Sequence, residues 1–143
     1  STFNYNSEGW GITTAGDHLI MSDGSNKLYH IAPSTFNILK EVEVYDHNGP
    51  VDQLNELEYV DGMIWANVWL TDRIVVIDPE TGIVRGELNL PGLLPAADKA
   101  RLDDKDDVLN GIAWNAGKGT FYFTGKRWPK LFEIKVKLIP YGR

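Results

Sequence analysis

The sequence predicts an all-β protein built from β-propeller blades, and three observations support this prediction. A short motif recurs three times along the 143 residues, at 9–12, 54–57 and 109–112. An apolar motif follows each copy, at 28–31, 74–77 and 131–134, so that 46 positions separate Leu28 from Ile74 and 57 separate Ile74 from Leu131. Turn sequences rich in Gly, Asp and Asn lie between these motifs. Repeats of about 40–50 residues with several short strands each are typical of propeller blades.

Each repeat predicts one antiparallel sheet of four strands. We place the three blades at about 9–44, 54–90 and 108–138, which makes residues 1–143 a partial β-propeller domain. Asp23-Gly24 and Asp61-Gly62 predict tight turns, because glycine accepts the positive φ that such turns need. The apolar and polar residues that alternate over 83–90 predict a half-buried strand at the end of the second blade.

Residues 91–107 interrupt the repeat as an insertion. The alanines after Pro95 predict one short helix over about Pro95 to Leu102. The acidic run Asp103 to Asp107 is interpreted as a solvated loop. Calcium binding is the alternative, but the run lacks the glycine and the closing glutamate of a calcium-binding loop.

Three blades do not close a propeller, which needs about four to eight. We therefore expect the remaining blades on another segment or chain. Residues Thr2 to Tyr5 are interpreted as a strand that completes a preceding blade. Because open sheets expose edges and apolar faces, the chain alone is expected to be inactive and prone to association.

Composition excludes several classes of function. The formal charge of −6 argues against binding to nucleic acid or to an anionic membrane. With no Cys, disulfides and thiolate chemistry are excluded, and the compartment is left open. The three His residues show no metal-ligand spacing, so we expect neither a metal nor another cofactor.

When the repeats are aligned, two rings of equivalent positions appear. Trp10, Asn55 and Asn110 are placed just before the first strands, and Asp23, Trp69 and Lys126 at the ends of the second strands. Equivalent positions of successive blades lie at the same level of the propeller axis, so these side chains are expected to converge on one end of the channel. The alternative is a packing signature, but the residue type changes between copies, which favours a ligand pocket.

The aromatic residues divide between core and pocket. Lys126 is surrounded in the sequence by Phe121 to Phe123 and Trp128, which predicts a partly desolvated ammonium group that could polarise a carbonyl. Trp65 and Trp114 are expected in the core.

Several sequence motifs follow one another along nearly the whole chain: Glu8-Gly9-Trp10-Gly11 with Ser22-Asp23-Gly24, 54–59 with 65–69, 71–74, 108–113, and 124–134. The last of them is long and specific. Together and in this order, these motifs resemble the glutaminyl cyclases of the plant and bacterial type.

The resemblance implies a five-bladed propeller of which this chain forms about the last three blades, and an acyltransferase that acts on peptides or proteins with an N-terminal glutamine. Such enzymes form pyroglutamate and release ammonia. It further implies that Trp10 and Trp69 wall the pocket, that Asn55 hydrogen-bonds the substrate, and that Lys126 lies near the reacting amide as the catalytic residue. A secreted or periplasmic location is expected.

The chain departs from the family because it lacks the family's catalytic glutamate. The family's catalytic glutamate lies in a Gly-Glu-Gly motif of an earlier blade, and a glutamine of the first blade is also missing here. Glu8 is two residues from the equivalent position, which Trp10 occupies. The alternative function is therefore a non-catalytic propeller that binds peptide ends or a protein partner.

Overall fold

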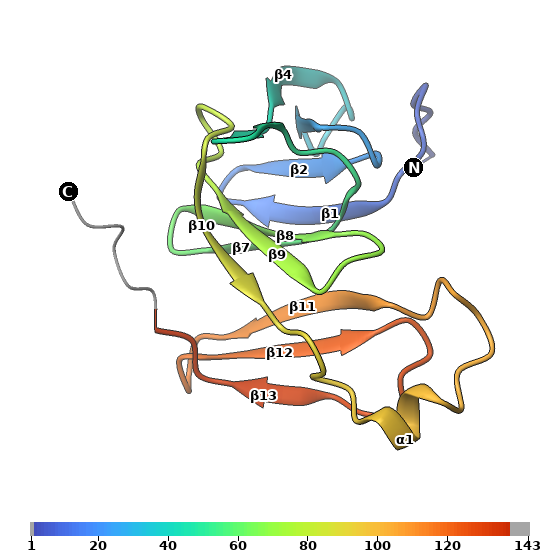
Figure 1. Cartoon of the computed structure of the whole chain (residues 1–143). Helices are drawn as coiled ribbons and strands as arrows, with labels where there is room; N and C mark the ends of the chain where they lie inside the picture. Colours follow the sequence, from blue (N-terminus) through green and yellow to red (C-terminus); the bar gives the residue numbers. More distant parts are fainter. Residues whose placement is uncertain (1, 138–143) are drawn as a thin grey trace.

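The computed structural model describes residues 2–137, and strands dominate this part of the chain. Three antiparallel sheets follow one another along the sequence and lie one above the other in Figure 1. Within the described residues, no helix is long and apolar enough to cross a membrane.

The first sheet contains β1 (Gly11–Ala15), β2 (His18–Ser22), β3 (Lys27–Ile31) and β4 (Ile38–Glu43), in this order. Sequential order with tight turns is the topology of a propeller blade. The strands β2 and β3 carry most of the buried apolar residues, and β4 at the outer edge is largely exposed. This gradient from a buried centre to an exposed edge follows from the apolar and polar pattern of each strand.

The second sheet has the same topology. It contains β7 (Leu54–Val60), β8 (Met63–Val68), β9 (Arg73–Ile77) and β10 (Val84–Asn89). The loop before it holds a small hairpin of β5 (Tyr45–Asp46) and β6 (Gly49–Pro50), which the sequence did not indicate. Tyr45 also forms an isolated parallel bridge with Ile83, and this joins the loop to the second blade.

The third sheet has three strands in the described residues: β11 (Leu109–Asn115), β12 (Thr120–Gly125) and β13 (Phe132–Ile134). Residue 138, where we placed the end of this blade, lies outside the described residues. The insertion contains α1 (Ala96–Lys99), so the helix is shorter than predicted, although turn hydrogen bonds continue to Leu102.

The sheets pack through their first strands, because β7 lies between β1 and β11. The Tyr59 N–H donates to Thr13 Oγ1 at 3.1 Å, and one repeat later the Trp114 N–H donates to Glu58 Oε1 at 2.9 Å. One apolar cluster fills the space between the first and second sheets, around Leu28, Leu54 and Ile77. Another fills the space between the second and third.

Two expectations about the first strands were wrong. Residues Thr2 to Tyr5 form no strand; instead the rings of Phe3 and Tyr5 each lie 5.7 Å from the ring of Phe36. Asn55 and Asn110 do not precede their strands but lie inside β7 and β11. Both strands shift register at these asparagines, between Leu54 and Leu57 and between Leu109 and Ile112, so the repeated motif forms a β-bulge.

Candidate functional site

The ring of Asp23, Trp69 and Lys126 lies at the ends of the second strands, as the sequence predicted. Asp23, Trp69 and Lys126 directly follow the last residues of β2, β8 and β12. The next residue of each turn has positive φ: 85° at Gly24, 64° at Leu70 and 56° at Arg127. A non-glycine residue in this left-handed region costs about 1–2 kcal/mol, and such strain is concentrated at functional sites.

Three of the candidate side chains lie in contact. The rings of Trp10 and Trp69 meet edge to face, with centroids 5.3 Å apart and planes at 80°. The Lys126 ammonium lies 5.6 Å from the centroid of the Trp69 ring, within the range of a cation–π interaction. Trp10 is itself fixed by a hydrogen bond of 2.7 Å from its indole N–H to Glu8. Residues from three successive blades therefore form one aromatic and cationic group.

Asn55 is the fourth candidate, and it is only 5% exposed. Its backbone oxygen accepts a hydrogen bond of 2.6 Å from Ser22 Oγ, and its side-chain oxygen accepts one of 3.5 Å from Asn110 Nδ2. Its strand is tied to the turn of Trp69, because the Trp69 N–H donates to the Gln53 carbonyl at 2.9 Å. The bulge thus places Asn55 two residues beyond the point where β7 meets the Trp69 turn.

Buried polar atoms without partners gather around the same turn. Within residues 2–137, Trp69 Nε1, Gln53 Oε1 and Asn67 Nδ2 are buried and make no hydrogen bond. Asn67 lies two residues before Trp69, and its other side-chain atom accepts a bond of 3.0 Å from the Gly111 N–H. Because an unsatisfied buried polar atom costs about 1–3 kcal/mol, such atoms are rare and their clustering favours a binding site.

One prediction about these rings was wrong, and it concerns Lys126. The carboxylate of Asp23 is held within its own blade, because Ser25 and Tyr29 donate hydrogen bonds to it. Burial by itself raises the pKa of Asp23, but these bonds outweigh it and hold the pKa below its ordinary value. Lys126 is exposed and not desolvated by the aromatics of its own strand, since Phe121 and Phe123 point into the core. Its aromatic partner belongs to the preceding blade.

The expectation for the other tryptophans was correct. Trp65 is 3% exposed, with its ring centroid 4.3 Å from that of Phe121, and Trp114 packs partly buried against the same ring.

The acidic run is more structured than predicted. Asp107 is 7% exposed and accepts a hydrogen bond of 2.7 Å from Arg127 Nε, and Asp104 lies 3.1 Å from the same guanidinium group. These bonds fix the insertion to the turn after Lys126. Within the described residues, no cluster of three or more His, Cys, Asp or Glu residues could hold a metal ion.

Sequence reasoning missed Glu56. This half-buried residue follows Asn55 in the bulge and lines a cavity together with Trp10 and Gly11. Burial, assisted by the charge of Glu58, raises the pKa of Glu56 above its ordinary value. A glutamate between Asn55 and Leu57 in the repeated motif was the only signal in the sequence.

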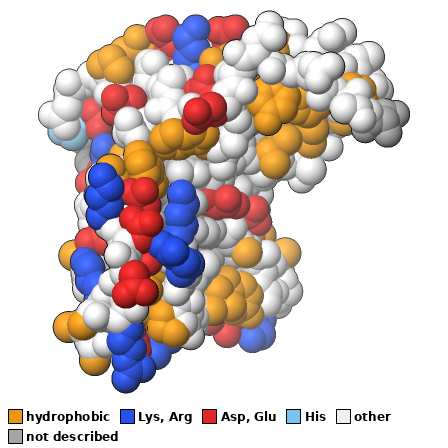
Figure 2. Space-filling view, turned by 90° about the vertical axis from the view of Figure 1, so that its right-hand side faces the viewer, with side chains coloured by type: hydrophobic (Ala, Val, Ile, Leu, Met, Phe, Trp, Pro, Cys, Tyr) orange, Lys and Arg blue, Asp and Glu red, His pale blue; other side chains and the backbone are white. Residues whose placement is uncertain are grey.

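The turns after β2, β8 and β12 all lie at the right-hand end of Figure 1, and Figure 2 looks onto this end. Acidic and basic side chains follow one side of this surface, and hydrophobic side chains border the hollow on the other side (Figure 2). The fold and the site together define a β-propeller protein with an aromatic and cationic group of side chains at one end of its blades.

The comparison with known families identifies which propeller this is. The chain matches the model of the glutamine cyclotransferase family over residues 1–136, and it therefore belongs to that family. It is 41% identical over 134 residues to the glutaminyl-peptide cyclotransferase of Arabidopsis thaliana, covering 91% of this chain and 40% of that protein. The chain thus spans less than half the length of this relative.

Solved structures confirm the fold class. The crystal structure of the Myxococcus xanthus glutaminyl cyclase superposes with a TM-score of 0.84 and 39% identity, covering 90% of this chain and 55% of that one. The β-propeller domain of Cps50 (Swd1), at 14% identity and a TM-score of 0.53, supports the fold alone. The number of blades in the whole protein and the division into domains stay predictions.

Proposed function

We propose that this chain forms the substrate-binding end of a glutaminyl-peptide cyclotransferase, which converts the N-terminal glutamine of a peptide or protein into pyroglutamate and releases ammonia. The observation that carries the proposal is the contact chain from Trp10 through Trp69 to Lys126 beside Asn55. Membership of the glutamine cyclotransferase family supports the same reaction.

The reaction is an intramolecular acyl transfer. The free α-amine attacks the side-chain carboxamide carbon, a C–N bond forms, and the bond to the amide nitrogen breaks. The proton that the α-amine loses leaves with that nitrogen as ammonia, so the atoms balance. Because both reactants belong to one residue, a site that holds the coiled conformer supplies much of the rate enhancement.

The residues divide these tasks by their chemistry. Trp10 and Trp69 form two walls at 80° to one another for the aliphatic part of the glutamine. Asn55 offers an amide that can donate and accept. Lys126 supplies a positive charge to the oxygen that becomes negative as the amine attacks.

Transfer of the proton to the leaving nitrogen calls for a group that can both take and give it, and a carboxyl group suits this task. The family resemblance assigns it to a glutamate of an earlier blade. In this chain Glu56 is a half-buried carboxyl group beside Asn55 whose raised pKa favours the protonated form more than usual. A protein with no such group would bind N-terminal glutamine without turning it over, and this is the alternative function.

The decisive experiment measures ammonia release from a peptide that begins with glutamine. This chain would be assayed alone and after fusion to the part of the Myxococcus xanthus glutaminyl cyclase that it does not cover. We expect release from the fusion and none from the chain alone. The matched substrate begins with asparagine, whose side chain is one methylene shorter and would have to close a four-membered ring.

Saturable binding of the glutamine peptide to the fusion without ammonia release would support the alternative. Failure to bind would contradict both functions. A secreted or periplasmic location also remains part of the proposal, and the family resemblance is its support.

A further inference from the structure

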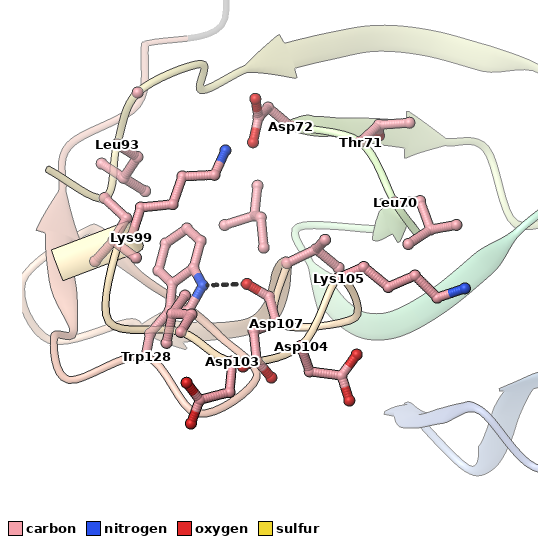
Figure 3. Close-up of a pocket in the computed structure, with 15 residues that line it drawn as sticks. Leu70, Thr71, Asp72, Leu93, Lys99, Asp103, Asp104, Lys105, Asp107 and Trp128 are labelled. Atoms are coloured by element: carbon pink, nitrogen blue, oxygen red, sulfur yellow. Dashed lines mark hydrogen bonds between the residues drawn. The ribbon is translucent and has the colours of Figure 1, made fainter. Parts of the chain in front are cut away.

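A cavity of about 430 Å³ lies beside the candidate site and has no role in the reaction described above. It opens between the insertion and the turn that follows β8. Trp128 and Leu93 lie on one side of it, and Leu70 and Thr71 on the other (Figure 3). Most of its apolar lining comes from leucines and one tryptophan: Leu70, Leu93, Leu94, Leu102, Leu109 and Trp128.

The walls of this cavity are fixed by specific contacts. The Trp128 indole N–H donates to the Asp107 carbonyl at 2.8 Å, and Arg127 Nε donates to the Asp107 carboxylate at 2.7 Å. Lys130 pairs with Asp98 at the helix of the insertion. The helix and the last residue of the insertion are therefore tied to the segment that follows Lys126, so the cavity exists before any ligand binds.

Residues that form the walls of the cavity are sequence neighbours of residues in the candidate site. Leu70 directly follows Trp69, and its left-handed backbone turns the chain so that the indole meets Trp10 while the Leu70 side chain lines the cavity. Leu70 is 52% exposed, so its side chain is accessible from the cavity. On the other wall, Trp128 packs on Gly125, the residue before Lys126.

We infer that this cavity is a subsite for the peptide beyond its N-terminal glutamine, and that it takes an apolar side chain of the second or third residue. An extended peptide advances by about 3.3 Å per residue, so these residues are the first to leave the Trp10 and Trp69 walls. The inference rests on the proposed function, because it takes the position of the glutamine from it. The leucines and Trp128 favour an apolar occupant, and charged side chains also line the cavity: Asp72, Lys99, Asp103, Asp104, Lys105 and Asp107.

The test compares two peptides, Gln-Leu-Leu-amide and Gln-Gly-Gly-amide, by calorimetric titration of the whole chain. We expect tighter binding of the leucine peptide. Leu70→Ala should weaken its binding roughly 3- to 10-fold, because several methylene groups lose their cover, and should leave the glycine peptide unchanged. Leu39→Ala is the matched control, since Leu39 is an exposed leucine of β4 in the first blade.

Two outcomes overturn the inference: equal affinities for the two peptides, or no effect of Leu70→Ala on the leucine peptide. Lack of binding by the leucine peptide overturns it as well. A third peptide, acetyl-Gln-Leu-Leu-amide, separates the two proposals. If it binds as tightly as the free peptide and still responds to Leu70→Ala, the subsite stands and recognition of the free α-amine fails.

Discussion

The Lys126 ammonium lies 5.6 Å from the centroid of the Trp69 ring, although the two residues come from successive blades. Each occupies the first position after a second strand, and each precedes a residue with positive φ. The same turn, used twice, therefore brings a cation to the face of an aromatic ring. Such a pair contributes about 0.5–1 kcal/mol when exposed, too little to explain two strained turns by stability alone.

The first prediction separates the roles of these two residues in the complete enzyme. Lys126→Ala should lower kcat by roughly 10²–10³, because a charge that meets the oxyanion only as it forms stabilises the transition state. Trp69→Ala should mainly raise KM, since an aromatic wall holds substrate and transition state alike. Steady-state kinetics of ammonia release from the active fusion measure both.

The matched control is Lys118→Ala. Lys118 is also exposed, but it pairs with Glu133 in the third blade at 3.0 Å, and its loss should leave kcat unchanged. If Lys126→Ala shifts KM alone, Lys126 anchors the peptide and another group stabilises the oxyanion.

The second prediction concerns Glu56, whose pKa is raised by burial and by Glu58. When a carboxyl group has a raised pKa in the folded state, stability is lost as the pH rises above 4.5, the ordinary value. The loss is complete once the pH exceeds the folded-state pKa. Glu56→Gln should therefore raise the melting temperature at pH 7, by roughly 1–4 °C, and should have no such effect at pH 3. Thermal unfolding at the two pH values measures this.

A stabilised Glu56→Gln variant with reduced ammonia release would identify a group kept for function at the expense of stability. Glu58→Gln is the companion variant, because its side chain already accepts the Trp114 N–H. Equal melting temperatures of wild type and Glu56→Gln at pH 7 would contradict the prediction.

The third prediction tests the contact between the first two blades. A Cβ at Gly11 would overlap the Asn55 backbone oxygen, which cannot move without disturbing the bulge. Gly11→Ala should destabilise the chain by about 1–3 kcal/mol or more, the usual cost of overpacking. Gly86→Ala in β10 is the control, because a Cβ there would meet its nearest atom, Val76 Cβ, at 4.0 Å. Denaturant unfolding of both variants gives the comparison, and equal loss in both would refute the proposed clash.

Much of the fold could be predicted because a repeat constrains every copy at once. The alternation of apolar residues and the Asp-Gly turns define each sheet locally, and the spacing between copies predicted the second ring. The bulges at Asn55 and Asn110 could not be predicted, because a register shift depends on the partner strand as well as on the strand itself.

The site was harder to predict where contacts cross between blades. Lys126 and its neighbouring aromatics are close in sequence, but the buried aromatics lie on the opposite side of the strand, and its real partner is 57 positions away. The ring position of Asp23 did not reveal the Ser25 and Tyr29 hydroxyl groups that hold its carboxylate. The cavity behind Leu70 needed the path of the insertion, which lies outside the repeat.

The last prediction concerns pH and a pair of histidines that joins the first blade to the second. His30 Nε2 lies 3.0 Å from the Pro79 carbonyl, and His30 Nδ1 lies 2.9 Å from His18 Nε2. A carbonyl oxygen only accepts, so His30 carries its proton on Nε2 and accepts a hydrogen bond from His18 on Nδ1. A second proton on His30 Nδ1 would place two donors face to face unless the proton of His18 moved to its Nδ1, which lies 3.0 Å from Asp17 Oδ1. The preference of His30 for the neutral form therefore comes from burial.

Burial lowers the pKa of His30 and outweighs the hydrogen bond to the Pro79 carbonyl, which raises it; His18 and Lys40 lower the pKa further, while the charge of Glu80 raises it. The unfolded chain therefore binds this proton more readily than the folded chain. Stability from the neutral form is complete above about pH 6.5, the ordinary value, and is lost as pH falls from there towards the lower folded-state pKa. We expect the melting temperature to drop by roughly 2–5 °C between pH 7.5 and pH 5.5.

His30→Gln removes the titrating group and keeps a polar side chain, so its melting temperature should depend less on pH over the same interval, although it is lower at pH 7.5. His47→Gln is the control, because His47 lies in the small hairpin loop between β5 and β6. An identical pH dependence in wild type and His30→Gln would mean that other groups cause the loss. The neutral His30 joint would then have no measurable effect on how the two blades hold together in acid.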